Sequence, residues 1–140
     1  MKNNKWYVIS TFVLGCIVIN FAGRILSDRL QLPLWLDSFG TVTAAYVLGP
    51  FCAAMVGMTV NLTYGILYSW TNMFYAVVSA MVGITTGICV KKGFLKNLYG
   101  VLSTSFLVAV LSVTLSVPFN YLYCDGSTQN IWGDGVIESM

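Results

Sequence analysis

The chain has 140 residues, of which 57% are hydrophobic and only 9% are charged. Because soluble domains carry about 25% charged residues, this composition excludes an ordinary soluble domain and indicates a single domain built for a lipid bilayer. The formal net charge of +2 is too small to indicate nucleic-acid binding. Histidine is absent and the four cysteines form no CxxC pair, so neither a zinc site nor a disulfide framework is predicted.

The first apolar run extends from Trp6 to Gly23, after a short basic start. A signal peptide is the alternative interpretation, but its apolar region is usually about 7 to 15 residues long and ends in a small-x-small cleavage site. We therefore predict a retained first span in which Asn20 faces other helices. The span is expected to end at Arg24, where a polar connection to Leu36 begins.

A second apolar region, from Ser38 to Val90, contains no charged residue. As helix it would be about 80 Å long, so it must fold back on itself within a hydrocarbon layer about 30 Å thick. Gly49 and Pro50 predict a tight turn between two helices. The arm from Ser38 to Gly49 is short for a crossing, and is either a short span sheltered by its neighbours or a re-entrant segment.

The longer arm, Pro50 to Ser69, is followed by a turn at Trp70 to Asn72 and a return helix from Met73 to Val90. Small residues recur every four positions on these helices, which favours close backbone packing in lipid. The predicted packing positions are Thr41, Ala45 and Gly49, then Ala53, Gly57, Asn61 and Gly65, and finally Ser79, Gly83 and Gly87. Asn20 and Asn61 are expected to form hydrogen bonds between helices.

A basic loop with Lys91, Lys92 and Lys96 precedes the last long apolar run, Asn97 to Cys124. This run predicts a final span that ends near Pro118. The polar, glycine-rich tail beyond it lacks the spacing of a calcium loop, so no metal site is expected.

The distribution of basic residues predicts the orientation of the chain. With a cytoplasmic N-terminus and five passages, five lysines lie inside and two arginines lie outside, as the positive-inside rule requires. The five lysines are Lys2, Lys5, Lys91, Lys92 and Lys96, and the two arginines are Arg24 and Arg29. The connection before Leu36, the Trp70 to Asn72 turn and the tail after Tyr121 then share the outer side.

We predict a substrate site between these three outer segments, because aromatic rings with amides can sandwich a planar ligand and satisfy its polar edge. The candidate substrate-binding residues are Trp35, Asp37, Trp70, Asn72, Asn120, Tyr121 and Trp132. Each has a structural alternative. Asp37, with Ser38, is a good N-cap for the following helix, the aromatic residues also suit an interfacial belt, and Trp35 in particular suits a membrane anchor.

The central hairpin also resembles a known family. LDSFGT, AAYVLGP and AAMVG are similar to the pattern of the substrate-binding S components of energy-coupling factor (ECF) vitamin transporters, and the tail STQNIWGDGVIESM is similar to the start of their sixth helix. The resemblance implies a six-helix protein that captures a vitamin or similar micronutrient at the outer face. It also implies a transmembrane coupling subunit and two ATPases as partners. Because the chain ends inside what would be the sixth helix, we expect either a fragment or a truncated copy.

The sequence thus predicts an all-α membrane bundle in one domain, residues 1–140, with about five spans and the start of a sixth in the cell membrane. Its expected function is substrate capture for an ECF-type uptake transporter, with no catalysis, cofactor, metal or nucleic-acid partner of its own. The alternative is a transmembrane ligand-sensing module of a signalling protein. A membrane enzyme is disfavoured because the acids lie at predicted helix ends, away from any buried catalytic pair.

Overall fold

The computed structural model describes residues 3–30 and 36–123, and every regular element in these two ranges is helical. The α-helices are α1 (Asn3–Leu30), α2 (Phe39–Val47), α3 (Pro50–Leu67), α4 (Asn72–Lys91) and α5 (Leu98–Tyr123). Two single-turn 3₁₀ helices, η1 (Leu36–Ser38) and η2 (Phe94–Lys96), precede α2 and α5. The predicted all-α class is confirmed.

Four of the described helices, α1, α3, α4 and α5, are long and apolar enough to cross a membrane. The nine residues of α2 form only about 14 Å of helix, which is shorter than the hydrocarbon layer. Helix α2 is nevertheless well protected, because it packs against α1, α3 and α4 and fully buries Ala44 and Ala45. The start of a sixth helix was predicted in a segment that lies outside the described residues.

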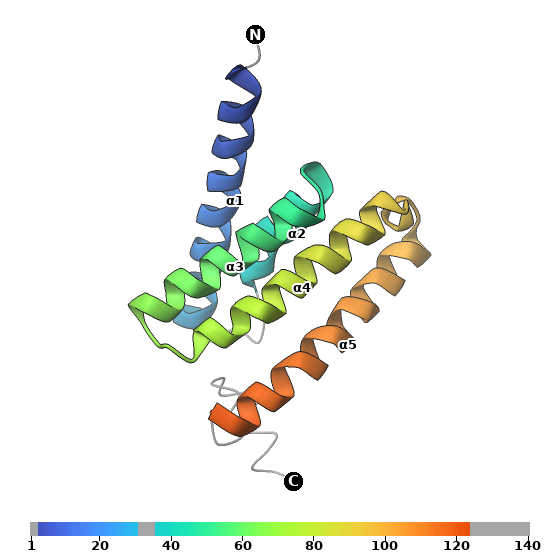
Figure 1. Ribbon diagram of the computed structural model, residues 1–140. Coiled ribbons are helices and arrows are strands. Elements are labelled where there is room, and N and C mark those ends of the chain that lie inside the picture. The colour runs from blue at the N-terminus through green and yellow to red at the C-terminus, as the bar shows by residue number, and fades with distance from the viewer. Residues whose placement is uncertain (1–2, 31–35, 124–140) are drawn as a thin grey trace.

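Helices α3 and α4 run antiparallel side by side at the centre of the molecule (Figure 1). Helix α5 lies along the other side of α4, whereas α1 flanks α2 and α3 and projects beyond the bundle at its N-terminal end (Figure 1). A small apolar core of Cys16, Ala44, Ala45, Ala53 and Val56 joins α1, α2 and α3.

Small residues hold the central helices close together. A Cβ atom at Gly83 would lie 2.7 Å from the backbone carbonyl carbon of Ala53, and one at Gly57 would lie 2.9 Å from the Cβ of Ser79. Both distances are too short for a real side chain, so the α3–α4 contact depends on these glycines. The predicted packing face is confirmed for α3 and α4.

The predicted turn and the two predicted asparagine contacts are also confirmed. Gly49 adopts a φ of 92°, a conformation that favours glycine, and Pro50 begins α3. The Asn20 amide donates to the Thr41 hydroxyl at 2.9 Å, and the Asn61 amide donates to the Ser79 hydroxyl at 2.6 Å. Both bonds connect different helices, so each buried amide is satisfied within the bundle.

Two predicted helix ends are wrong. Helix α1 continues past Arg24 to Leu30 because the polar side chains of its last turns find partners on other elements. Helix α5 continues past Pro118 to Tyr123. Proline removes a single helical N–H donor, a loss that membrane helices accommodate through local adjustment.

The predicted cap of α2 is not formed by side chains. Ser38 occupies the N-cap position without a side-chain capping bond, and Asp37 lies in η1. The Asp37 carboxylate instead accepts a hydrogen bond from Arg24 at 3.2 Å. A charge-assisted bond to a guanidinium is stronger than a bond to a neutral backbone N–H, which explains this choice of partner.

Candidate functional site

The described parts of the segments predicted to form the site meet at one end of the bundle. Contacts between side chains join the last turns of α1 to η1 and to the start of α4, and join α4 to the end of α5. The basic loop between α4 and α5 lies at the other end of α4, whose 20 residues form about 30 Å of helix. The two ends of the molecule therefore differ in chemistry.

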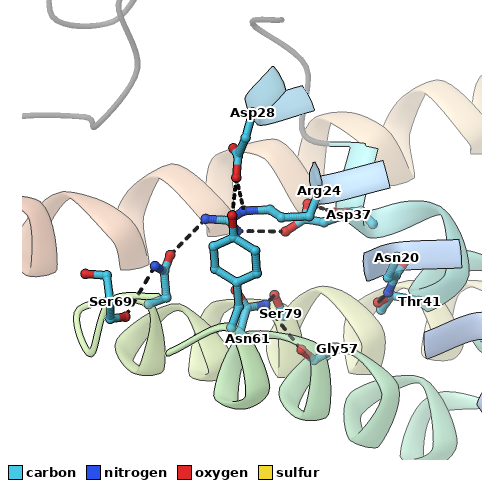
Figure 2. A network of polar contacts seen from close by, with 12 residues as sticks. Asn20, Arg24, Asp28, Asp37, Thr41, Gly57, Asn61, Ser69 and Ser79 are labelled. Atoms are coloured by element: carbon cyan, nitrogen blue, oxygen red, sulfur yellow. Dashed lines mark hydrogen bonds and ion pairs between the residues drawn. The ribbon is translucent and has the colours of Figure 1, made fainter. Parts of the chain in front are cut away.

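A network of polar side chains, here called the Arg24 cluster, consists of Arg24, Asp28, Asp37, Tyr64 and Asn72 (Figure 2). Arg24 donates from Nη1 to the Asp37 carboxylate at 3.2 Å and from Nη2 to the Asn72 amide oxygen at 2.8 Å. Its Nε lies 3.9 Å from the Asp28 carboxylate. One guanidinium thus links α1, η1 and α4.

Tyr64 connects α3 to the same network. The guanidinium carbon of Arg24 lies 4.7 Å from the centre of the Tyr64 ring, within range of a cation–π interaction. The Tyr64 hydroxyl donates to the Asp28 carboxylate. The ring also stacks on Tyr68 and meets the edge of Phe21, so the aromatic side of the cluster is fixed from two directions.

Burial makes the Arg24–Asp37 pair energetically important. The two side chains are only 15% and 7% exposed, whereas that of Asp28 is 50% exposed. A buried ion pair offsets its desolvation only when further hydrogen bonds complete the geometry, and the Asn72 amide supplies such a bond. The cluster therefore has an inner, buried pair and an outer, accessible carboxylate.

A second group, here called the aromatic cluster, contains Trp70, Phe74, Phe119 and Tyr123. Phe74 stacks on Tyr123 with ring centres 4.3 Å apart and on Phe119 at 5.6 Å. Trp70 meets the rings of Phe74 and Tyr123 edge to face. The cluster joins the start of α4 to the end of α5 and leaves Trp70 63% exposed.

The predicted site residues divide between these two groups. Asp37 and Asn72 both bind Arg24, and Trp70 belongs to the aromatic cluster. Asn120 accepts a hydrogen bond from the Tyr75 hydroxyl, while Tyr121 is exposed and contributes to neither group. Trp35 and Trp132 lie outside the described residues.

Arg24, Asp28 and Tyr64 are central to the cluster but were not predicted as site residues. The sequence held a partial signal, because Arg24 and Asp28 are four residues apart and share one face if the helix continues. Because the first span was predicted to end at Arg24, Asp28 was not expected to lie on the same helix. Tyr64 gave no comparable signal, since a tyrosine in an apolar helix is common and its partner is 36 residues away.

The chemistry of the arrangement suits recognition of a polar, partly aromatic molecule. The Arg24 guanidinium is already bonded to Asp37 and Asn72, whereas the exposed Trp70 can stack on a planar ligand. Among the described residues, no three His, Cys, Asp or Glu side chains gather in a way that could hold a metal ion.

Fold and site together define an all-α, multi-pass membrane protein with a buried ion pair at one end of its bundle. Comparisons with protein-family models, with curated proteins and with solved structures each find no match.

Proposed function

We propose that the chain is the substrate-capture subunit of an ECF-type uptake transporter for a vitamin or similar micronutrient. The observation that carries the proposal is the convergence of the Arg24 cluster and the aromatic cluster at one end of α4. The resemblance of LDSFGT, AAYVLGP and AAMVG to the S-component pattern supplies the transporter class. In this proposal, that end of the bundle faces the outside of the cell.

In this proposal, aromatic and polar side chains at this end of the bundle have different roles in ligand binding. The exposed Trp70 ring offers a surface on which a planar ring can stack. Asn120 and Asn72 already have internal partners, so polar groups of a ligand would exchange with these bonds. Few buried polar groups are left unpaired when the ligand also accepts hydrogen bonds from the displaced Tyr75 hydroxyl and Arg24 N–H, which is the condition for tight and specific binding.

Transport would require partner subunits. A phosphate-binding glycine loop is absent from the sequence, so we propose that the chain has no ATPase activity or turnover by itself. Only 11% of an 18-residue apolar stretch in each of α1 and α5 is buried within the described part of the bundle. Their wide apolar faces suit contact with lipid and with a transmembrane coupling subunit.

The first experiment identifies the ligand. We expect mass spectrometry of the detergent-purified protein to reveal a co-purified small molecule that contains a planar ring and polar substituents. Recovery of only lipid and detergent, after purification from cells grown in rich medium, would count against substrate capture.

The second experiment separates transport from sensing. Liposomes that hold this chain alone should bind the identified compound without concentrating it, and adding a coupling subunit and ATPases should produce ATP-driven accumulation. Accumulation by the chain alone would contradict the need for partners. Binding without uptake, even with the partners present, would instead favour the ligand-sensing module.

A further inference from the structure

The end of the bundle opposite the Arg24 cluster carries a concentrated positive charge. Lys91, Lys92 and Lys96 lie within six residues of one another and all three are exposed. Asp28 and Asp37 are the acids of the described ranges, and both lie at the other end of the molecule. Within the part of the chain that the structure describes, the lysines are therefore not neutralised by a carboxylate.

The loop that carries these lysines has a defined conformation. Backbone N–H groups of Lys92 and Gly93 donate to Ile88 and Val90 carbonyls at 2.9 Å, and Gly93 adopts a φ of 79°. The Lys91 stem lies against the α2–α3 turn, since its Cε would be 3.7 Å from a Cβ at Gly49. The positive charges are thus held close to two different helix connections.

An open hollow lies between this loop and the first turns of α5. The polar residues Lys92 and Asn97 and the aromatic residues Phe94 and Tyr99 are among those that line it. Lys91 ends one membrane-spanning helix and Leu98 begins the next, so the hollow lies at the membrane boundary. Leu98 and Tyr99 are largely exposed beside it.

We infer that this basic hollow binds the phosphate headgroup of an anionic phospholipid. The lysines supply a positive potential at the headgroup level, where each basic residue strengthens attraction to an anionic leaflet. The neighbouring Phe94, Leu98 and Tyr99 supply apolar surface for the start of the acyl chains. A soluble anion would use the lysines and leave this apolar surface unmatched.

The experiment uses the full-length protein in detergent micelles and native mass spectrometry. Phosphatidylglycerol and phosphatidylcholine with identical acyl chains are added separately, and the retained lipid adducts are counted. Wild-type protein should retain phosphatidylglycerol preferentially, and added salt should reduce the preference.

Substitutions then locate the site. Lys92→Gln should weaken phosphatidylglycerol retention roughly fivefold, and replacing Lys91, Lys92 and Lys96 together by glutamine should weaken it about a hundredfold. Lys5→Gln is the matched control, because Lys5 is an exposed lysine on α1, outside the lining of the hollow. It should leave the preference unchanged. Exposed Lys→Gln changes should preserve thermal stability, and Lys92→Gln alone suffices if the triple variant misfolds.

Three outcomes would overturn the inference. Equal retention of the two lipids by the wild-type protein would remove the headgroup preference. An effect of Lys5→Gln as large as that of Lys92→Gln would reduce the result to overall charge. Displacement of phosphatidylglycerol by inorganic phosphate at equal concentration would identify a site for a free anion.

Discussion

The two ends of the bundle differ in whether their basic side chains are buried or exposed. At one end Arg24 is buried, and its positive charge is balanced by Asp37 and hydrogen-bonded to Asn72 within the protein. At the other end Lys91, Lys92 and Lys96 are exposed, away from the described acids. Both ends are formed by the termini of helices that are long and apolar enough to cross a membrane, and yet they differ in their consequences for stability and binding.

The difference shows that position on a helix does not determine the role of a basic residue in a membrane protein. Arg24 lies a turn and a half before the end of α1, where η1 and α4 cover it and bring an acid and an amide. Lys91 and Lys92 lie where α4 ends, and both are exposed. A charged side chain that other helices bury forms ion pairs and hydrogen bonds within the protein. An exposed charged side chain is free to interact with molecules outside the protein.

The two ends of the bundle should differ most in how their residues react with a label added outside the cell. In a background without the native cysteines, Tyr68→Cys should react with a membrane-impermeant maleimide on intact cells and Lys92→Cys should not. The positive-inside distribution of lysines is the reason. Both variants should react after permeabilisation, and the reverse pattern on intact cells would contradict the proposed orientation.

Removing Arg24 should cost far more stability than removing a lysine. Arg24→Ala leaves the Asp37 carboxylate buried without its cation, which should lower the free energy of unfolding by about 3 to 5 kcal/mol. Lys92→Ala changes an exposed loop residue and should stay within about 0.5 kcal/mol of wild type.

Equilibrium unfolding in detergent measures both changes. Replacing the pair together, as in Arg24→Met with Asp37→Leu, should recover much of the loss because no buried charge remains. If Arg24→Ala and Lys92→Ala had equal effects, the buried pair would not be important for the fold.

The close contact between α3 and α4, here called the seam, can be tested with two glycines, one inside the contact and one outside it. Gly57→Leu should cost about 1 to 3 kcal/mol, because the new side chain would overlap Ser79 and force the helices apart. Gly15→Leu is the matched control, since a Cβ at Gly15 meets no atom within 4 Å. Thermal unfolding should separate the two variants, and equal melting temperatures would show that the seam tolerates separation.

Much of the fold could be predicted because the bilayer imposes simple rules. The Gly49–Pro50 turn, the close approach at Gly57 and Gly83 and the Asn20 and Asn61 contacts follow from turn chemistry and helical spacing. Helix ends were harder to place. Arg24 looked like the end of a span, but tertiary partners allow α1 to continue to Leu30.

The site could be predicted only in part, for the same physical reason. Topology brings Asp37, Trp70, Asn72 and Asn120 to one end, as the alternation of spans requires. Which side chains touch depends on helix rotation and on contacts between distant residues, and the sequence does not encode these locally. Tyr64 joined the cluster through such a contact, with Asp28 on another helix.

The central claim, that ligand binds at the Arg24 end, is tested most directly by calorimetry on two tryptophan variants. Trp70 and Trp6 are 63% and 71% exposed. Trp70 lies in the connection between α3 and α4 and Trp6 lies in the first turn of α1. Figure 1 shows that connection and the N-terminal end of α1 towards opposite ends of the bundle. With the co-purified compound as ligand, Trp70→Ala should weaken binding by about 1 to 3 kcal/mol, and Trp6→Ala should leave it unchanged. Unchanged affinity in Trp70→Ala, or an equal loss in Trp6→Ala, would contradict the claim and reduce both tryptophans to membrane anchors.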